Sequence, residues 1–165
     1  MSSLKKILVP TDLSEMSLSV EEVLRSLLGN RDVEVYLLHI LESVSPHQTP
    51  YLDASSETAL RDREKEAGLR LEKIGQRMLP RSVRVVPVVL RGDPVRLIIG
   101  YAQEKHCDVI VMATHGRTGL AHILVGSVAE KVVRHSSVPV LSVKPKALQA
   151  QVVALADVEE QLHVR

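Results

Sequence analysis

Hydrophobic residues fall into short runs of strand length that alternate with segments of helical periodicity. The runs are rich in β-branched residues and apolar almost throughout, which is typical of strands buried on both faces of a parallel sheet. They lie at residues 7–9, 33–41, 83–90, 109–113 and 138–143. Because a helical segment separates each run from the next, the pattern predicts the element order β-α-β-α-β-α-β-α-β.

The segments between the runs contain residues that start or stop helices. The predicted helices cover about residues 17–28, 58–78 and 94–105, and a fourth begins at residue 127. Asp93 is placed to cap the third helix, and Pro94 fits its first position. Ser127 and Glu130 have the spacing of a capping box, which predicts that the Ser127 side chain caps the fourth helix.

Strands joined by helical crossovers predict a doubly wound α/β fold: one five-stranded parallel sheet with helices on both faces. Such sheets bind ligands at the carboxyl ends of their strands, where the strand order reverses. We expect one domain over residues 1–145, followed by a tail over 146–165 that is helical or frayed. Residues 42–57, rich in Ser and Pro, form the one long predicted loop, which is either a lid or a connector.

The composition narrows the class of protein. Hydrophobic residues make up 45% and charged residues 25%, as in ordinary globular chains. With 2% aromatic residues, the chain has few side chains on which bases could stack. Its net charge is +1 and it has no basic stripe, so both features argue against nucleic-acid binding. No apolar run approaches the length of a membrane span. The lone Cys107 fits a reducing compartment, so we expect a cytoplasmic protein.

The segment that joins the fourth run to the fourth helix carries the most chemistry. Small residues at Ala113, Gly116 and Gly119 let the backbone approach a ligand closely. Gly126 and Ser127 place backbone N–H groups and a hydroxyl at a helix N-terminus, an arrangement that attracts phosphate. Alternatively, the glycines shape an ordinary turn and Ser127 only caps its helix. Both interpretations stay open, because the P-loop and dinucleotide fingerprints are absent.

Neither a metal site nor a catalytic centre is predicted. The chain has seven histidines, but none has HExxH context or the spacing of a metal site. His115 is better interpreted as a side chain that orders its loop. Ser127 lacks a GxSxG elbow and a placed His and Asp pair, so we do not expect it to act as a nucleophile.

These residues nevertheless form a familiar pattern. The segments that resemble the universal stress protein family are Lys6 to Asp12, His39, Val111 to Gly119, Gly126–Ser127 and Pro139 to Val143. The resemblance spans about residues 4–144 and implies an adenine-nucleotide-hydrolase-like fold. In nucleotide-binding members the loop reads Gly, two residues, Gly, nine residues, Gly and then Ser or Thr. Here Ala113 replaces the first Gly and adds a methyl group where backbone meets ligand.

The resemblance implies a site for ATP, with or without Mg²⁺. Adenine and ribose would be held by Pro10, Thr11, Asp12 and Ile40, and the base pocket would be lined by Met112 and Ala113. His115 would order the loop. The residues around the phosphates would be Gly116, Arg117, Gly126, Ser127 and Val128. Asp12 would accept the ribose hydroxyls; its alternative role is a charge favourable to the next helix. Arg117 would be the only fixed positive charge near the phosphates. Its alternative is an exposed side chain with no role in binding.

Three hypotheses follow. The first is a homodimeric ATP-binding stress-response regulator, whose occupancy changes a surface that an unidentified protein partner reads. The resemblance implies dimerisation through the last strand, Val138 to Val143. The second is an interaction module of the same fold that binds no nucleotide, which Ala113 favours. The third is a slow ATPase, although the sequence shows no base for hydrolysis.

Overall fold

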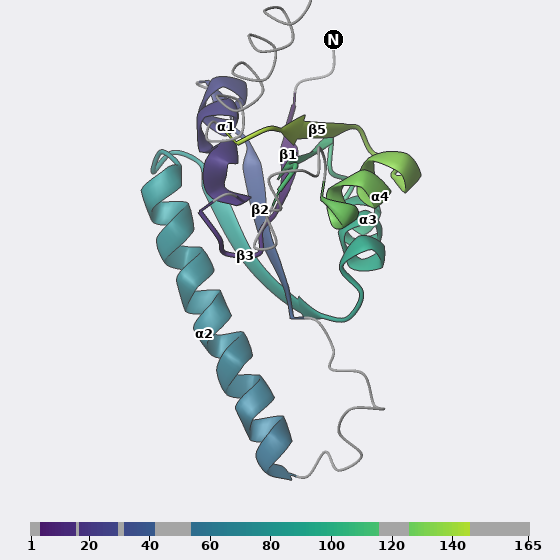
Figure 1. The fold of residues 1–165 in the computed structure, drawn as a ribbon. Helices are drawn as coiled ribbons and strands as arrows, with labels where there is room; N and C mark the ends of the chain where they lie inside the picture. The colour runs from purple at the N-terminus through teal and green to yellow at the C-terminus, as the bar shows by residue number, and fades with distance from the viewer. Residues whose placement is uncertain (1–3, 16, 30–31, 42–53, 116–125, 146–165) are drawn as a thin grey trace, which may run out of the picture.

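Strands and helices alternate along the chain in the predicted order (Figure 1). The computed structural model describes residues 4–15, 17–29, 32–41, 54–115 and 126–145. The elements are β1 (Lys6–Pro10), η1 (Ser17–Val20), α1 (Glu21–Leu28), β2 (Glu34–Leu41), α2 (Ala54–Met78), β3 (Arg84–Arg91), α3 (Pro94–Glu104), β4 (Val109–Ala113), α4 (Ser127–His135) and β5 (Val140–Val143).

The five strands form one parallel sheet in the order β3-β2-β1-β4-β5. Ile7 of β1 is the register partner of Val35 in β2 on one side and of Val109 in β4 on the other. The chain therefore travels outward from β1 to β3, then returns to start again at β4. This reversal is the topological switch point of a doubly wound fold, which confirms the predicted sheet.

Two helical layers cover the sheet, α1 and α2 on one face and α3 and α4 on the other (Figure 1). Successive strand residues point to opposite faces. Ile7 and Val9 pack toward α1 and α2, whereas Leu8 between them packs with Ile98 of α3 and Val132 of α4. Because both faces are covered, the strands read as nearly continuous apolar runs.

Several predicted boundaries need correction. The first predicted helix begins with the 3-10 turn η1, and the last strand begins at Val140 rather than Val138. Helix α2 begins at Ala54, so the predicted loop over residues 42–57 was too long. The choice between lid and connector then concerns residues 42–53, which, like the tail over 146–165, lie outside the described residues. The Asp93 cap is confirmed, since its Oδ1 accepts the Arg96 N–H at 2.8 Å.

Helix α2 is longer than the strands that it covers. Its C-terminal half packs on the sheet through Leu71 and Met78, and its N-terminal half continues past the carboxyl ends of β2 and β3 (Figure 1). Close packing is possible at Gly75, where an added Cβ would lie 2.7 Å from a methyl carbon of Val85. No helix in the described part of the chain is long and apolar enough to cross a membrane.

A comparison of two glycines tests the packing of α2. We expect Gly75→Ala to be less stable than Gly68→Ala by about 1–3 kcal/mol, because the new methyl group overpacks the stiff Val85 side chain. A Cβ added at Gly68 would have no atom within 4 Å, so Gly68→Ala gains helix propensity without a clash. Urea unfolding of both variants measures the difference, and equal stability would contradict the close contact.

Candidate functional site

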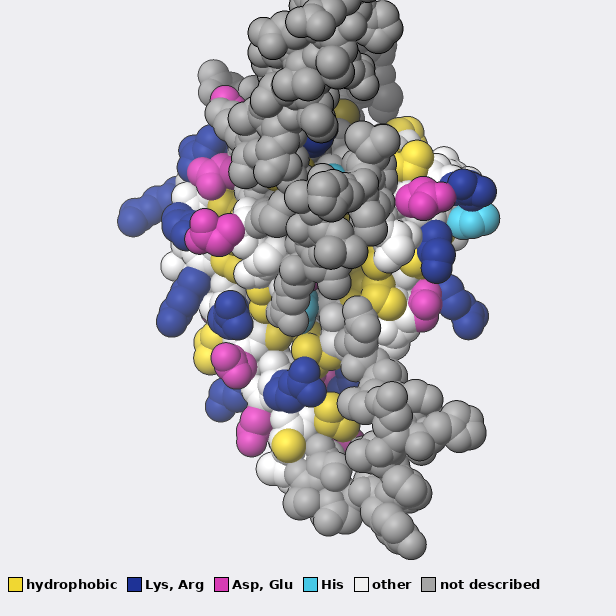
Figure 2. All heavy atoms as spheres, in the orientation of Figure 1, with side chains coloured by type: hydrophobic (Ala, Val, Ile, Leu, Met, Phe, Trp, Pro, Cys, Tyr) yellow, Lys and Arg dark blue, Asp and Glu magenta, His cyan; other side chains and the backbone are white. Residues whose placement is uncertain are grey.

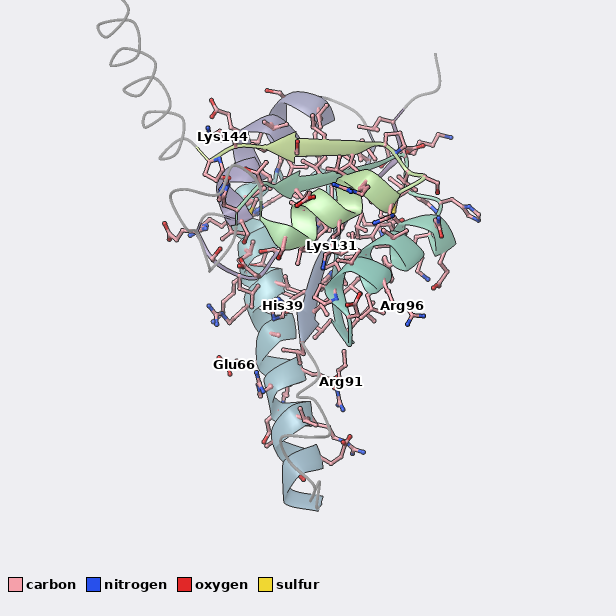
Figure 3. The ribbon with its side chains drawn as sticks, turned by 45° about the vertical axis from the view of Figure 1, so that its right-hand side comes forward. His39, Glu66, Arg91, Arg96, Lys131 and Lys144 are labelled. Atoms are coloured by element: carbon pink, nitrogen blue, oxygen red, sulfur yellow. The ribbon has the colours of Figure 1, made fainter. Side chains whose placement is uncertain are left out.

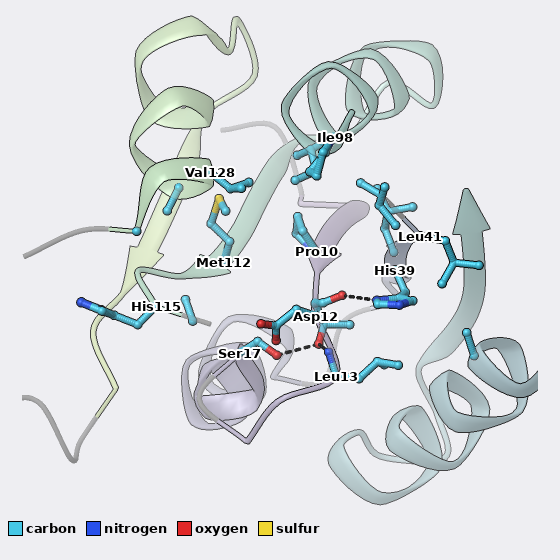
Figure 4. A pocket seen from close by; sticks show the side chains of 18 of the residues that line it. Pro10, Asp12, Leu13, Ser17, His39, Leu41, Ile98, Met112, His115 and Val128 are labelled. Carbon is cyan, nitrogen blue, oxygen red and sulfur yellow. Dashed lines mark hydrogen bonds between the residues drawn. The ribbon is translucent and has the colours of Figure 1, made fainter. Parts of the chain in front are cut away.

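A cavity of about 580 Å³ opens at the carboxyl end of the sheet. Its walls come from the ends of β1, β2 and β4, the first turns of α3 and α4, and one side of α2. His115 and Val128 lie on one side of it, and His39 and Leu41 lie on the other (Figure 4). The cavity spans the switch point between β1 and β4, and its volume falls in the range typical of small-molecule sites.

The structure brings together every predicted site residue that it describes. Those that line this cavity are Pro10, Thr11, Asp12, Ile40, Met112, Ala113, His115, Gly126, Ser127 and Val128. Gly116 and Arg117 lie outside the described residues. The shared cavity does not assign a ligand contact to any of them, so these roles stay predictions.

A hydrogen-bonded turn follows β1 and holds Asp12 at the cavity. The Ser17 hydroxyl donates to the Ser14 carbonyl at 2.8 Å, so the Thr11 hydroxyl, 2.8 Å from the Ser17 oxygen, donates to it. Thr11 Oγ1 in turn accepts the Leu13 N–H at 3.0 Å. Asp12 Oδ1 accepts from both the backbone N–H and the hydroxyl of Ser14, at 3.0 and 2.6 Å. One carboxylate oxygen of Asp12 therefore orders the turn.

His39 is a cavity residue that the site prediction left out. It is buried, and its Nδ1 lies 2.8 Å from the Thr11 carbonyl oxygen. A carbonyl can only accept, so Nδ1 carries the proton that it donates. This bond ties the end of β2 to the turn after β1. The position of His39 near the carboxyl end of a buried strand was the signal that could have found it.

Gly126 lets the start of α4 approach the end of β4. Its N–H donates to the Thr114 carbonyl oxygen at 2.6 Å, and an added Cβ would lie 3.0 Å from the same oxygen. Gly126 is the N-cap residue, and no side chain caps α4. The predicted capping box was therefore wrong, because Ser127 is already the first helical residue. Ser127 and the helix N-terminus lie at the cavity instead.

The Ala113 methyl group has a place in the protein's own packing. Ala113 is 8% exposed and belongs to the core beneath α1 and α2, although it also borders the cavity. The next two residues are buried and polar, and the Thr114 hydroxyl lies 2.9 Å from His115 Nδ1. The role of His115 in ordering its loop stays a prediction.

Helix α2 supplies charges that the sequence interpretation missed. Arg63, Glu66, Ala67 and Arg70 line the cavity, so the expectation of a single positive charge near the site was wrong. These charged residues look like part of a solvated helix face in the sequence. Their spacing of three, four and seven residues, however, places the three charged residues along the edge of the stripe that packs on the sheet.

Other titratable groups do not suggest a metal or thiol site. Within the described residues, no three His, Cys, Asp or Glu side chains are grouped to hold a metal ion. Burial raises the pKa of the Cys107 thiol to about 11, so it is protonated and unreactive at neutral pH. On the face shown in Figure 2, Lys and Arg are interspersed with Asp and Glu.

Residues 3–144 match the sequence model of the universal stress protein family. The chain belongs to this family. Universal stress protein MJ0531 of Methanocaldococcus jannaschii is 36% identical over 140 residues, which cover 85% of this chain and 82% of that protein. The match confirms the resemblance predicted from the motifs.

Solved universal stress proteins share the fold. The structure of MJ0577 from the same organism superposes with a TM-score of 0.78 at 30% identity, covering 88% of this chain and 99% of that one. A family protein from Arabidopsis thaliana, solved with AMP bound, has a TM-score of 0.61 at 23% identity and covers 87% and 93%. The predicted universal stress protein fold is thereby confirmed.

Removing one hydroxyl tests the turn that holds Asp12. We expect Ser17→Ala to lower the free energy of unfolding by about 1–3 kcal/mol, because the buried Thr11 hydroxyl loses its acceptor. Ser26→Ala, on the exposed side of α1, is the control and should change little. Chemical unfolding gives both values. An unchanged Ser17→Ala stability would show that the network does not hold the turn.

Proposed function

We propose that this universal stress protein binds an adenine nucleotide in the cavity and acts as a regulator rather than as a metabolic enzyme. The nucleotide is ATP, with or without Mg²⁺, and residues 1–145 form the binding domain. The observation that carries this proposal is the make-up of the cavity, which joins an apolar floor, a carboxylate and a helix N-terminus at the switch point.

Each part of the cavity suits one part of a nucleotide. Pro10, Ile40 and Met112 offer an apolar surface to the base. Asp12 lies at the centre of the site, where a carboxylate can accept the ribose hydroxyls (Figure 4). The N-terminus of α4, beginning at Ser127, offers backbone N–H groups and the positive end of the helix dipole to the phosphates.

Two observations favour this proposal over a module that binds no nucleotide. The Ala113 side chain is buried among core residues, so its methyl group has packing partners within the protein. The Arabidopsis protein of this family was solved with AMP bound. A slow ATPase would need a base, and His115 gives no support for one, because its Nδ1 contacts the Thr114 hydroxyl.

A charge placed at the α4 N-terminus tests the phosphate site. We expect Ser127→Glu to weaken ATP binding by at least about tenfold, because its carboxylate repels the phosphates. The fold should persist, since an acidic residue is favourable at a helix N-terminus. Ser26→Glu, an exposed position on α1, is the matched control. Mass analysis of nucleotide released from denatured protein and calorimetric titration provide the measurements.

The outcomes separate the hypotheses. Released nucleotide in the wild type and in Ser26→Glu, but not in Ser127→Glu, supports a nucleotide-dependent regulator. A wild type that carries no nucleotide and shows no heat on titration supports the interaction module. Product formation that scales with the amount of protein would support the slow ATPase.

We further propose a homodimer through the strand from Val138 to Val143, with an unidentified protein partner reading its surface. β5 is an edge strand of the sheet, and its Leu141 is 37% exposed. An edge strand has unpaired backbone groups, and pairing with a second copy would cover them.

A single substitution on the edge tests the dimer. We expect Leu141→Lys to give a monomer, because each copy would bring a charged side chain to the paired edges and edge lysines oppose strand pairing. Val140 is left unchanged because it packs against the core. Val133→Lys removes a similarly exposed apolar side chain from α4 and is the control. Sedimentation velocity measures the state, and a dimeric Leu141→Lys would rule out this interface.

A further inference from the structure

The stripe of α2 that faces the sheet changes its chemistry where the helix reaches the cavity. Leu71 and Met78 are buried against the sheet in the C-terminal half. Around the buried Ala67, the helix carries Arg63, Glu66 and Arg70, which are exposed and line the cavity. The change indicates that this wall of the cavity faces water or a polar or charged ligand.

The two arginines of this wall are not used in ion pairs by the described residues. Two of the acids on this part of α2, Glu57 and Glu64, both pair with Arg91. Among the described residues, Arg63 and Arg70 appear in no such pair, and both are exposed. Their positive charge is therefore not neutralised by a described neighbour within ion-pair distance.

Arg91 holds this wall in place. It is the last residue of β3, beside α2 at the carboxyl end of the sheet (Figure 3). Arg91 Nη1 lies 3.6 Å from Glu57 Oε2, and its Nε contacts Glu64 Oε1. Glu57 and Glu64 are about two turns apart, so one side chain spans that length of α2. The cavity wall is thereby anchored where the helix has run past the sheet.

The attraction between the exposed arginines and a ligand depends on the charge of the ligand. Two unit charges about 10 Å apart in water interact weakly, and salt screens the interaction further. The interaction is multiplied by the number of phosphate charges and is zero for an uncharged nucleoside. Arg63 and Arg70 add to the attraction, and Glu66 between them subtracts from it.

We propose that Arg63 and Arg70 make the cavity select its nucleotide by charge, favouring a triphosphate over a monophosphate and over the free nucleoside. This inference rests on the proposed function, because it presupposes that an adenine nucleotide occupies the cavity. It assigns the selectivity to these α2 residues, in addition to the N-terminus of α4.

Calorimetric titration of ATP, AMP and adenosine at low salt tests the inference. In Arg63→Gln/Arg70→Gln we expect the ATP affinity to fall about three- to tenfold, with adenosine affinity unchanged and a weaker salt dependence of ATP binding. Lys65→Gln/Lys73→Gln is the control, because it removes the same charge from exposed α2 residues that do not line the cavity. Glu66→Gln should raise ATP affinity about twofold.

The other outcomes overturn the inference. An unchanged ratio of ATP to adenosine affinity would show that the arginines do not select by charge. Equal losses for ATP and adenosine would indicate that they only shape the wall. An equal ATP loss in the lysine control would assign the effect to the net charge of the protein. If wild-type protein binds none of the three ligands, the proposed function itself fails, a result distinct from binding without selectivity.

Discussion

The structure depends on the parallel pairing of β1 with both β2 and β4. β1 lies at the centre of the sheet, and the chain changes direction across it. The helices that follow β1 and β2 therefore cover one face, while those that follow β3 and β4 cover the other. The chain leaves β1 and β4 toward opposite faces of the sheet, and in the described part of the chain a cavity remains between them at its carboxyl end. The cavity is a consequence of topology before any particular side chain is considered.

Backbone hydrogen bonds at this end of the sheet keep the cavity walls in register. The Thr11 N–H donates to the Leu38 carbonyl at 2.8 Å, and the Thr114 N–H donates to the Val143 carbonyl at 2.9 Å. Each bond continues the strand pairing beyond the end of β1 or β4. Backbone groups here would otherwise lie buried without partners, at considerable cost. The walls of the cavity are thus extensions of the sheet rather than independent loops.

Local patterns predicted the sheet, whereas the resemblance to the family predicted most of the cavity residues. Continuous apolar runs specify strands buried on two faces, and Asp93 before Pro94 specifies a helix start. The capping box failed because Ser and Glu three residues apart do not reveal that Gly126 occupies the cap position. Arg63 and Arg70 were missed for a different reason. A charged helix stripe resembles a solvated face until the tertiary structure shows that the helix extends past the sheet.

The proposed ligand site and the proposed dimer edge are separated by a single strand pairing. Ala113 at the cavity is the register partner of Val143 in β5, the strand whose Leu141 is exposed. Paired strands move together, because sliding one past the other breaks every bond of the ladder. A ligand that shifts the end of β4 at the cavity therefore shifts the end of β5 with it. A regulator built on this fold needs no long pathway between its ligand and its surface.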